Sequence, residues 1–394
     1  MDTIKETEMV REFDILIYGA TGFTGKLVAE YVVEQYGKNI KWGMAGRSKN
    51  KLEAVRDAIG APADTPLVVC DSDNDAEVAA MVAQTKVLIT TVGPYQLYGD
   101  KVIVACANAG TDYVDLCGEP NWIANQVIGL DDAAKKSGAR IVFSCGFDSI
   151  PTDLGVFYLQ EQAKARLGHV LPRIRGRVRD MQGSASGGTV ASGAATTAAV
   201  QKDPSIMGLL ISPFAQTPGF EGPAQPDGNT PYYDEAVGSW VGPFMMAMIN
   251  TKAVHRSNYL MQHPWGEDLQ YDEMIMLSGD PATADAAAVD PFAMDASLKP
   301  GDGPSLEERN AGYYDIIFAG SNDAGEKLQA CVKGDMDPGY GSTSKMLAES
   351  AICLALDISK DRTGGGCWTT ASSMGPELIS RLEAHAGLSF SIED

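Results

Sequence analysis

The stretch FDILIYGATGFTGKLVAEYV, residues 13–32, decides the fold class of this sequence. The residues before its glycines are apolar and β-prone, which predicts a strand. Those after them place Leu27, Tyr31 and other apolar side chains on one helical face. The glycines therefore lie where a strand leads into a helix, which is the context of a dinucleotide-binding loop.

Three glycines in this stretch have the spacing G-x-x-G-x-x-G. Gly19 permits a sharp turn, Gly22 lets a pyrophosphate approach the backbone, and Gly25 lets the helix pack closely on the strand. A plain glycine turn is the alternative reading. The residues expected to bind the cofactor here are Gly19, Thr21, Gly22, Phe23, Thr24 and Gly25.

The end of the next strand indicates which dinucleotide is bound. About 20 residues past the glycines, an NAD enzyme places an acidic residue for the ribose hydroxyls. This sequence has Gly46-Arg47-Ser48 there, followed by Lys51. A guanidinium, a hydroxyl and an ammonium can surround a 2′-phosphate, so we expect NADP(H). An ordinary polar turn is the other interpretation.

The composition excludes several classes of protein. The 394 residues carry 52 acidic and 31 basic side chains, a net charge of −21, which disfavours nucleic acid and anionic membranes as partners. The amino terminus is charged, and no run approaches the ~20 apolar residues of a membrane span. We therefore expect a cytoplasmic protein, with peripheral membrane association and a homodimer left open. The seven cysteines include no C-x-x-C pair, so neither a metal site nor disulfides are expected.

The first 150 residues alternate between short apolar strands and helices. Strands are expected at residues 67–71, 87–93, 112–118 and 140–146, with helices between them. This rhythm predicts an α/β fold with a doubly wound parallel sheet of the Rossmann type.

Ligands of such a sheet bind outside the carboxyl ends of its strands. Asp71 follows the third strand and could contact the adenine, although a helix cap is the alternative. The segment Gly93, Pro94 and Tyr95 follows the fourth strand, where the nicotinamide is expected. Glu119 follows the fifth strand and is either functional or an ordinary solvated carboxylate.

Several motifs together resemble one family. GATGFTG, AGRS with Lys51, TVGPYQLYG, YVDLCGE and CGFDSIPTDLG occur in this order, and SASGGT, DPGYGSTSKMLAESA and GCWTTASSMGPELISRL follow. The chain is similar over almost its whole length to the saccharopine dehydrogenase-like oxidoreductases, whose branches include mycobacterial trans-acting enoyl reductases. The resemblance implies an NADP-binding domain and an oxidoreductase activity.

The pattern and the resemblance together imply three segments. Residues 1–150 form the Rossmann domain, residues 151–340 an α+β domain for substrate or oligomerisation, and residues 341–394 a helical segment that packs back on the Rossmann domain. Two strands at residues 313–320 and 327–333 are expected to form a hairpin. Residues 212–231 are a Pro/Gly-rich passage, and residues 279–305, rich in Ala, Asp, Pro and Gly, are expected to be a mobile excursion rather than a domain linker.

The catalytic residues are less evident than the cofactor loop. None of the 14 tyrosines has a lysine four positions later, which disfavours the Tyr-x-x-x-Lys chemistry of short-chain dehydrogenases. Tyr95, Asp148 and Cys117 follow strands of the nucleotide-binding part and are the candidates for the proton donor. The expected substrate wall consists of Ser186, Gly187, Thr189, Phe244 and His255.

The positions of the arginine and lysine residues indicate which class of substrate the protein can bind. The run RIRGRVR, residues 173–179, places four arginines on one face of a strand, either as a solvated face or as an anion site. Residues 207–248 are rich in Met and Phe, which favours an apolar ligand over an amino acid. We expect NADPH-dependent reduction of a C=C or C=O bond in a lipid-like substrate. An amino-acid dehydrogenase of the saccharopine type and a non-enzymatic NADP(H)-binding protein are the alternatives.

Overall fold

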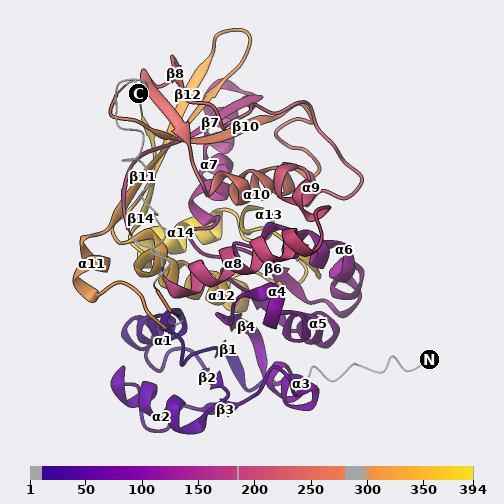
Figure 1. Cartoon of the computed structure of the whole chain (residues 1–394), viewed down its shortest axis with the longest axis vertical. Helices are drawn as coiled ribbons and strands as arrows, with labels where there is room; N and C mark the ends of the chain where they lie inside the picture. The colour runs from indigo at the N-terminus through magenta and orange to yellow at the C-terminus, as the bar shows by residue number, and fades with distance from the viewer. Residues whose placement is uncertain (1–10, 184–185, 280–297, 300, 394) are drawn as a thin grey trace.

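The computed structural model describes residues 11–183, 186–279, 298–299 and 301–393. Within these residues the chain forms two seven-stranded sheets. Figure 1 shows the first sheet with its helices in the lower half of the view and the second sheet in the upper half, with helix α8 crossing between them.

The first sheet is parallel and has the strand order β13-β6-β5-β4-β1-β2-β3. Its strands are β1 (Phe13–Tyr18), β2 (Trp42–Gly46), β3 (Leu67–Val69), β4 (Thr85–Thr90), β5 (Asp112–Val114), β6 (Arg140–Val142) and β13 (Gly366–Trp368). Six of these strands have the Rossmann order 3-2-1-4-5-6. The direction in which successive strands are added to the sheet reverses between β1 and β4. The predicted doubly wound sheet is therefore confirmed.

Helices cover both faces of the first sheet. They are α1 (Phe23–Gln35), α2 (Lys49–Ala58), α3 (Asp75–Ala83), α4 (Tyr95–Tyr98), α5 (Asp100–Ala109) and α6 (Pro120–Ser137). Side chains of α3, α5 and α6 form one apolar core, whereas α1 contributes to a second core that continues into the other sheet. The two sheets thus share one continuous apolar interior.

The strands of the first sheet are shorter than the sequence predicted. They end at Val69, Thr90, Val114 and Val142. Two backbone amides just beyond β5 and β6, those of Cys117 and Ser144, donate hydrogen bonds to the Asp115 carboxylate and not to a neighbouring strand. The residues that follow these strands are consequently loops at the carboxyl edge of the sheet.

The second sheet has the order β14-β12-β11-β7-β10-β9-β8. Its strands are β7 (Arg173–Gln182), β8 (Tyr232–Asp234), β9 (Ser239–Pro243), β10 (Gln270–Met276), β11 (Tyr313–Ser321), β12 (Lys327–Gly334) and β14 (Leu388–Glu393). Strands β7 and β10 are parallel, and the other pairs are antiparallel. The predicted hairpin is present as β11 and β12.

The arginines of β7 form neither a solvated face nor a free anion site. Arg177 is completely buried and pairs with Asp234 and Asp272, each at 2.8 Å. Arg173 also pairs with Asp272, and Arg179 pairs with carboxylates of β11 and β14. Carboxylates from distant segments neutralise this row, so it is structural.

The remaining helices connect and cover the two sheets. They are α7 (Ile150–Leu167), α8 (Gly187–Lys202), α9 (Ile206–Ile211), α10 (Ala247–Leu260), α11 (Leu306–Ala311), the π-helix η2 (Pro338–Ser342), α12 (Thr343–Leu356), α13 (Thr370–Ser373) and α14 (Pro376–His385). The Pro/Gly-rich residues 212–231 contain no helix or strand. Most of the segment 279–305 and residues 184–185 of SASGGT lie outside the described residues.

The carboxyl-terminal segment contains two strands, β13 and β14, in addition to the predicted helices. Helix α12 packs against α1, β1 and β4, while β13 joins the edge of the first sheet beside β6. The last strand, β14, pairs instead with β12 in the second sheet. The domain boundaries at residues 150 and 340 stay a prediction. Among the described helices, none has both the length and the apolar character needed to cross a bilayer.

Candidate functional site

The loop between β1 and α1 has a geometry suited to a dinucleotide. Gly19 has a φ of +90°, and a Cβ at Gly25 would collide with the carbonyl oxygen of Gly19, so the helix packs directly on the turn. A Cβ at Gly22 would have that same oxygen, at 3.3 Å, as its only near neighbour. Gly22 therefore leaves open space in front of the helix, where a ligand can approach the backbone.

The amino terminus of α1 carries no side-chain cap and no acidic residue in its first turn. Ser48, Asn74 and Ser186 cap the helices α2, α3 and α8, whereas α5, α6 and α7 lack a side-chain cap as α1 does. What distinguishes α1 is the glycine turn that precedes it. Uncapped amides and the positive end of the helix dipole suit a phosphate, so the loop fits the pyrophosphate of NADP(H).

The predicted ribose residues lie at the end of β2 and the start of α2. Arg47 and Lys51 are exposed, and neither forms an ion pair within the described part of the chain. Ser48 accepts a hydrogen bond from the amide of Lys51 at 3.4 Å as the cap of α2. Asp71 accepts one from the amide of Asp73 at 3.1 Å, which is the bonding of a turn before α3. The two cations thus stay available for a ligand.

A cavity of about 730 Å³ lies at the carboxyl edge of the first sheet. The start of α1 and the loops after β4, β5 and β6 form one wall, and α8, α9, η2 and the start of α10 form the other. The described residues that line it include no Lys, Arg or His, and Asp148 is the single acidic residue among them. Nor do the described residues contain a cluster of His, Cys, Asp or Glu side chains that could hold a metal ion.

Asp148, in the loop after β6, presents its carboxyl group to this cavity. No described residue forms a hydrogen bond with that carboxyl group. Burial raises the pKa of Asp148 to about 7, and the nearby carboxylate of Glu273 contributes in the same direction. A carboxyl group with this pKa is partly protonated at neutral pH and can act as an acid.

Tyr95 also lines the cavity, together with Gly93, but its hydroxyl group points elsewhere. That hydroxyl donates a hydrogen bond to the carbonyl oxygen of Thr90 at 3.0 Å and accepts one from the amide of Leu116 at 3.4 Å. Burial raises the pKa of Tyr95 well above its usual value. This bonding makes Tyr95 a weaker candidate than Asp148 for proton donation. Pro94 occupies the N-cap position of the short helix α4, which Tyr95 begins, and forms no side-chain cap.

Glu119 is fully buried, so the interpretation as a solvated carboxylate was wrong. It accepts hydrogen bonds from the amides of Tyr95 at 2.8 Å and Gln96 at 2.9 Å. The hydroxyl of Ser192, in α8, donates to the same carboxylate at 2.8 Å. Glu119 therefore joins the loops after β4 and β5 to the opposite wall of the cavity.

Cys117 lies beside the cavity but is not part of its described lining. The thiol is completely buried, and loss of solvation raises its pKa well above the usual value. A thiol in this state is a poor acid and a poor nucleophile at neutral pH. The geometry thus gives no support to Cys117 as a catalytic residue.

The chain is similar to known proteins over most of its length. A family model described as the saccharopine dehydrogenase NADP binding domain matches residues 15–142. A protein of Mycobacterium tuberculosis, named as a provisional trans-acting enoyl reductase, is 37% identical over 97% of this chain and 98% of its own length. The trans-acting enoyl reductase of Mycobacterium ulcerans is 35% identical over 94% of this chain and 96% of its own.

The chain belongs to the saccharopine dehydrogenase-like oxidoreductase family. It is an NADP-dependent oxidoreductase. The saccharopine dehydrogenase (L-Glu forming) of Saccharomyces cerevisiae has the same fold, with a TM-score of 0.56, 13% sequence identity, and coverage of 96% of this chain and 99% of that one.

The second part of this oxidoreductase contributes some of the predicted substrate residues to the cavity. Ser186 and Thr189 line it, and Gly187 is buried at the start of α8. Phe244 is buried in the apolar core, and Met245 and Met246 after it line the cavity instead. His255 is buried against Phe214 at 4.6 Å between ring centroids, and burial lowers its pKa to about 3. The structure places neither Phe244 nor His255 in the described lining.

Two further side chains of α8, Ser192 and Thr196, face the nucleotide-binding part, and the sequence analysis missed them. They share one helical face with Thr189; Thr189 bonds to Tyr340 at 2.8 Å, Ser192 to Glu119 at 2.8 Å, and Thr196 to Gln96 at 3.0 Å. Their spacing of three and four residues is a possible signal. Small polar residues on a helix rich in Gly and Ala are also typical of ordinary surface, so the spacing alone carries little information.

Arg47→Ala is expected to weaken NADPH binding by about 1–3 kcal/mol and to leave NADH binding unchanged, because the guanidinium would contact only the 2′-phosphate. Fluorescence titration of this oxidoreductase with each nucleotide measures both affinities. Lys49→Ala is the matched control, since Lys49 is an exposed neighbour that faces Glu53 at 4.0 Å. Equal affinity of the parent protein for NADPH and NADH would contradict this assignment.

Proposed function

We propose that this oxidoreductase uses NADPH to reduce a C=C bond conjugated to a carbonyl group in an uncharged, lipid-like substrate. The observation that carries the proposal is the cavity at the carboxyl edge of the first sheet, whose described lining has one carboxyl group and no cation. The residues that line it also include Met207, Leu210, Met245 and Met248, which suit an apolar chain.

The residues of this chain can supply what the reaction needs besides the hydride. Bound NADPH supplies a hydride, which the carbon β to the carbonyl group accepts. The carbon α to it must then receive a proton, and we assign that donation to Asp148, whose carboxyl group lies in the cavity without a hydrogen-bond partner among the described residues. The names of the relatives, trans-acting enoyl reductases, support C=C over C=O reduction.

An amino-acid substrate of the saccharopine type has less support. Such a substrate carries several carboxylates, which require arginine or lysine partners. The described lining of the cavity has none, and the arginines of β7 are paired with carboxylates of the protein. A purely nucleotide-binding role has less support as well, because it gives Asp148 no function.

The proposed substrate also bears on location. Met207, Met245 and Met248 are partly exposed as well as lining the cavity, so its mouth is apolar. We propose a cytoplasmic protein that contacts lipid surfaces peripherally at this mouth. A homodimer stays a prediction, which the mass of the protein in solution tests.

The test is consumption of NADPH with uncharged trans-α,β-unsaturated acyl thioesters of N-acetylcysteamine. We expect turnover that rises with acyl chain length, because longer chains bury more apolar surface along the methionines. The saturated thioester is the control without a C=C bond. Turnover with amino or 2-oxo acids in place of these thioesters would contradict the proposal.

A further inference from the structure

Phe23, the first residue of α1, is contacted by two side chains from a remote part of the chain. The ring of Tyr340, in η2, meets the Phe23 ring edge to face, with 5.2 Å between the centroids. The guanidinium carbon of Arg309, in α11, lies 5.9 Å from the centroid of the same ring. A cation from outside the predicted nucleotide-binding domain therefore lies next to the glycine loop.

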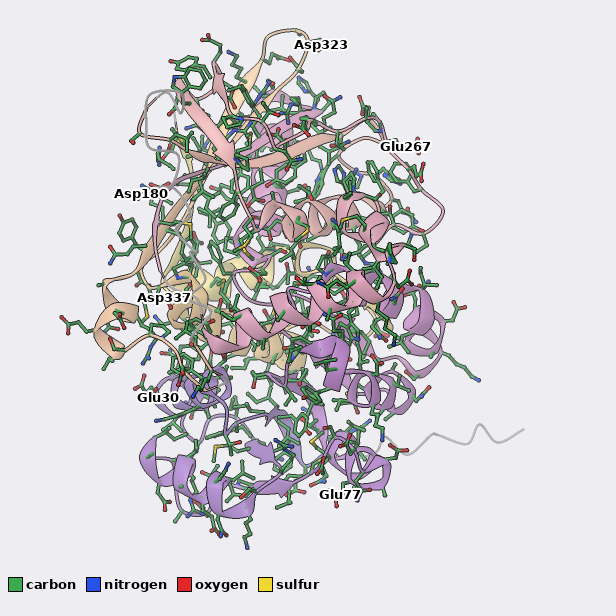
Figure 2. The ribbon with its side chains drawn as sticks, in the orientation of Figure 1. Glu30, Glu77, Asp180, Glu267, Asp323 and Asp337 are labelled. Atoms are coloured by element: carbon green, nitrogen blue, oxygen red, sulfur yellow. The ribbon has the colours of Figure 1, made fainter. Side chains whose placement is uncertain are left out.

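The segment that carries these side chains is firmly held. The Asp337 carboxylate accepts hydrogen bonds from the amides of Gly339, Tyr340 and Gly341 at 3.3, 2.8 and 3.0 Å. The amide of Asp337 in turn donates to the carbonyl oxygen of Arg309 at 2.9 Å. In Figure 2, Asp337 lies between Glu30 of α1 and Asp180 of β7, at the level where the two halves of the molecule meet. The position of Arg309 beside the loop is thus built into the fold.

The charge of Arg309 is not neutralised within the described part of the chain. Its Nη1 donates a hydrogen bond to the carbonyl oxygen of Pro304 at 2.8 Å, and it forms no ion pair there. This is notable in a protein with 52 acidic and 31 basic residues. A guanidinium has five N–H donors, so most of them stay available for an anion.

We infer that Arg309 binds the pyrophosphate of NADP(H) beside the amino terminus of α1. The inference rests on the proposed placement of the pyrophosphate at the amino terminus of α1. Phe23 belongs to that terminus, whereas Arg47 follows β2 and Lys51 lies in the first turn of α2, where the 2′-phosphate is expected. Arg309 therefore acts on a part of the cofactor that NADPH and NADH share.

The test compares nucleotide affinities of the parent protein, Arg309→Met, Arg309→Lys and Arg47→Ala. Methionine keeps an apolar stem over Phe23 without the charge, and lysine keeps the charge. Arg309→Met is expected to raise the Kd of NADPH and of NADH by about tenfold each, the effect of one charge-assisted hydrogen bond. Arg309→Lys is expected to recover part of this loss. The salt dependence of the Kd should also become weaker in Arg309→Met.

Two outcomes would overturn the inference. An unchanged Kd for both nucleotides in Arg309→Met would show that the cation does not contact the cofactor, and a loss confined to NADPH would place it on the 2′-phosphate. Thermal unfolding of each variant separates an affinity loss from unfolding, and recovery in Arg309→Lys excludes a purely structural role. Failure of the parent protein to bind NADPH would instead contradict the cofactor site itself.

Discussion

Asp148→Asn is expected to lower kcat for the reduction of an enoyl thioester by about 10²–10⁴-fold, the usual contribution of a general acid. The amide keeps the shape of the side chain but cannot donate an acidic proton to the α-carbon. Binding of NADPH is expected to stay as in the parent protein, because Asp148 belongs to the proposed reaction site and not to the phosphate sites. Stopped-flow and steady-state rates of NADPH oxidation, with fluorescence titration of the nucleotide, measure the two effects separately.

The pH dependence gives the same assignment a second test. Burial raises the pKa of Asp148 from 3.8 to about 7, so the carboxyl group is mostly protonated below pH 7 and mostly ionised above it. An acid must be protonated to act, so kcat is expected to fall as the pH rises through about 7. Asp148→Asn should lack this decrease. If the variant keeps both the parent rate and the parent pH profile, another group supplies the proton.

Gly22→Val is expected to abolish NADPH binding, with a loss of more than about 100-fold in affinity, while unfolding stays cooperative. Gly22 has φ of −81° and ψ of 170°, which valine also adopts, and its Cβ would have one close neighbour, the carbonyl oxygen of Gly19 at 3.3 Å. The added side chain would occupy the place proposed for the pyrophosphate. Fluorescence titration and thermal unfolding of the same preparation measure the two properties.

Gly25→Ala is the matched control for Gly22→Val. A Cβ at residue 25 would collide with the carbonyl oxygen of Gly19, so this smaller substitution should lower the melting temperature. Gly22→Val is thus expected to lose nucleotide binding, whereas Gly25→Ala is expected to lose stability. Normal NADPH binding by Gly22→Val would mean that the loop is only a turn.

The parts of the fold that depend on local pattern could be predicted from the sequence. The strand, glycine loop and helix around Gly19, Gly22 and Gly25 lie within a short segment, and spacing alone indicates their arrangement. The same holds for the hairpin of β11 and β12, whose turn lies between two β-prone runs. The parallel sheet followed from the alternation of strands and helices.

Features that depend on distant partners could not be predicted. The arginines of β7 gave two open interpretations because Asp234 and Asp272, which neutralise Arg177, lie far along the chain. Nothing in the sequence around His255 indicates that its ring is buried against Phe214. Tyr340 and Arg309 meet Phe23 across most of the chain length, and no local pattern indicates such a contact.

The arrangement of β13 and β14 affects how the protein can be made. Strand β13 pairs with β6 at one edge of the first sheet, and β14 pairs with β12 at one edge of the second sheet. Both strands come from residues 366–393. While the ribosome is still adding this stretch, β6 and β12 expose unpaired backbone groups, which can pair with strands of other chains. Because each sheet lacks one of its strands until residues 366–393 have been synthesised, we expect neither half to complete its folding before this stretch has left the ribosome.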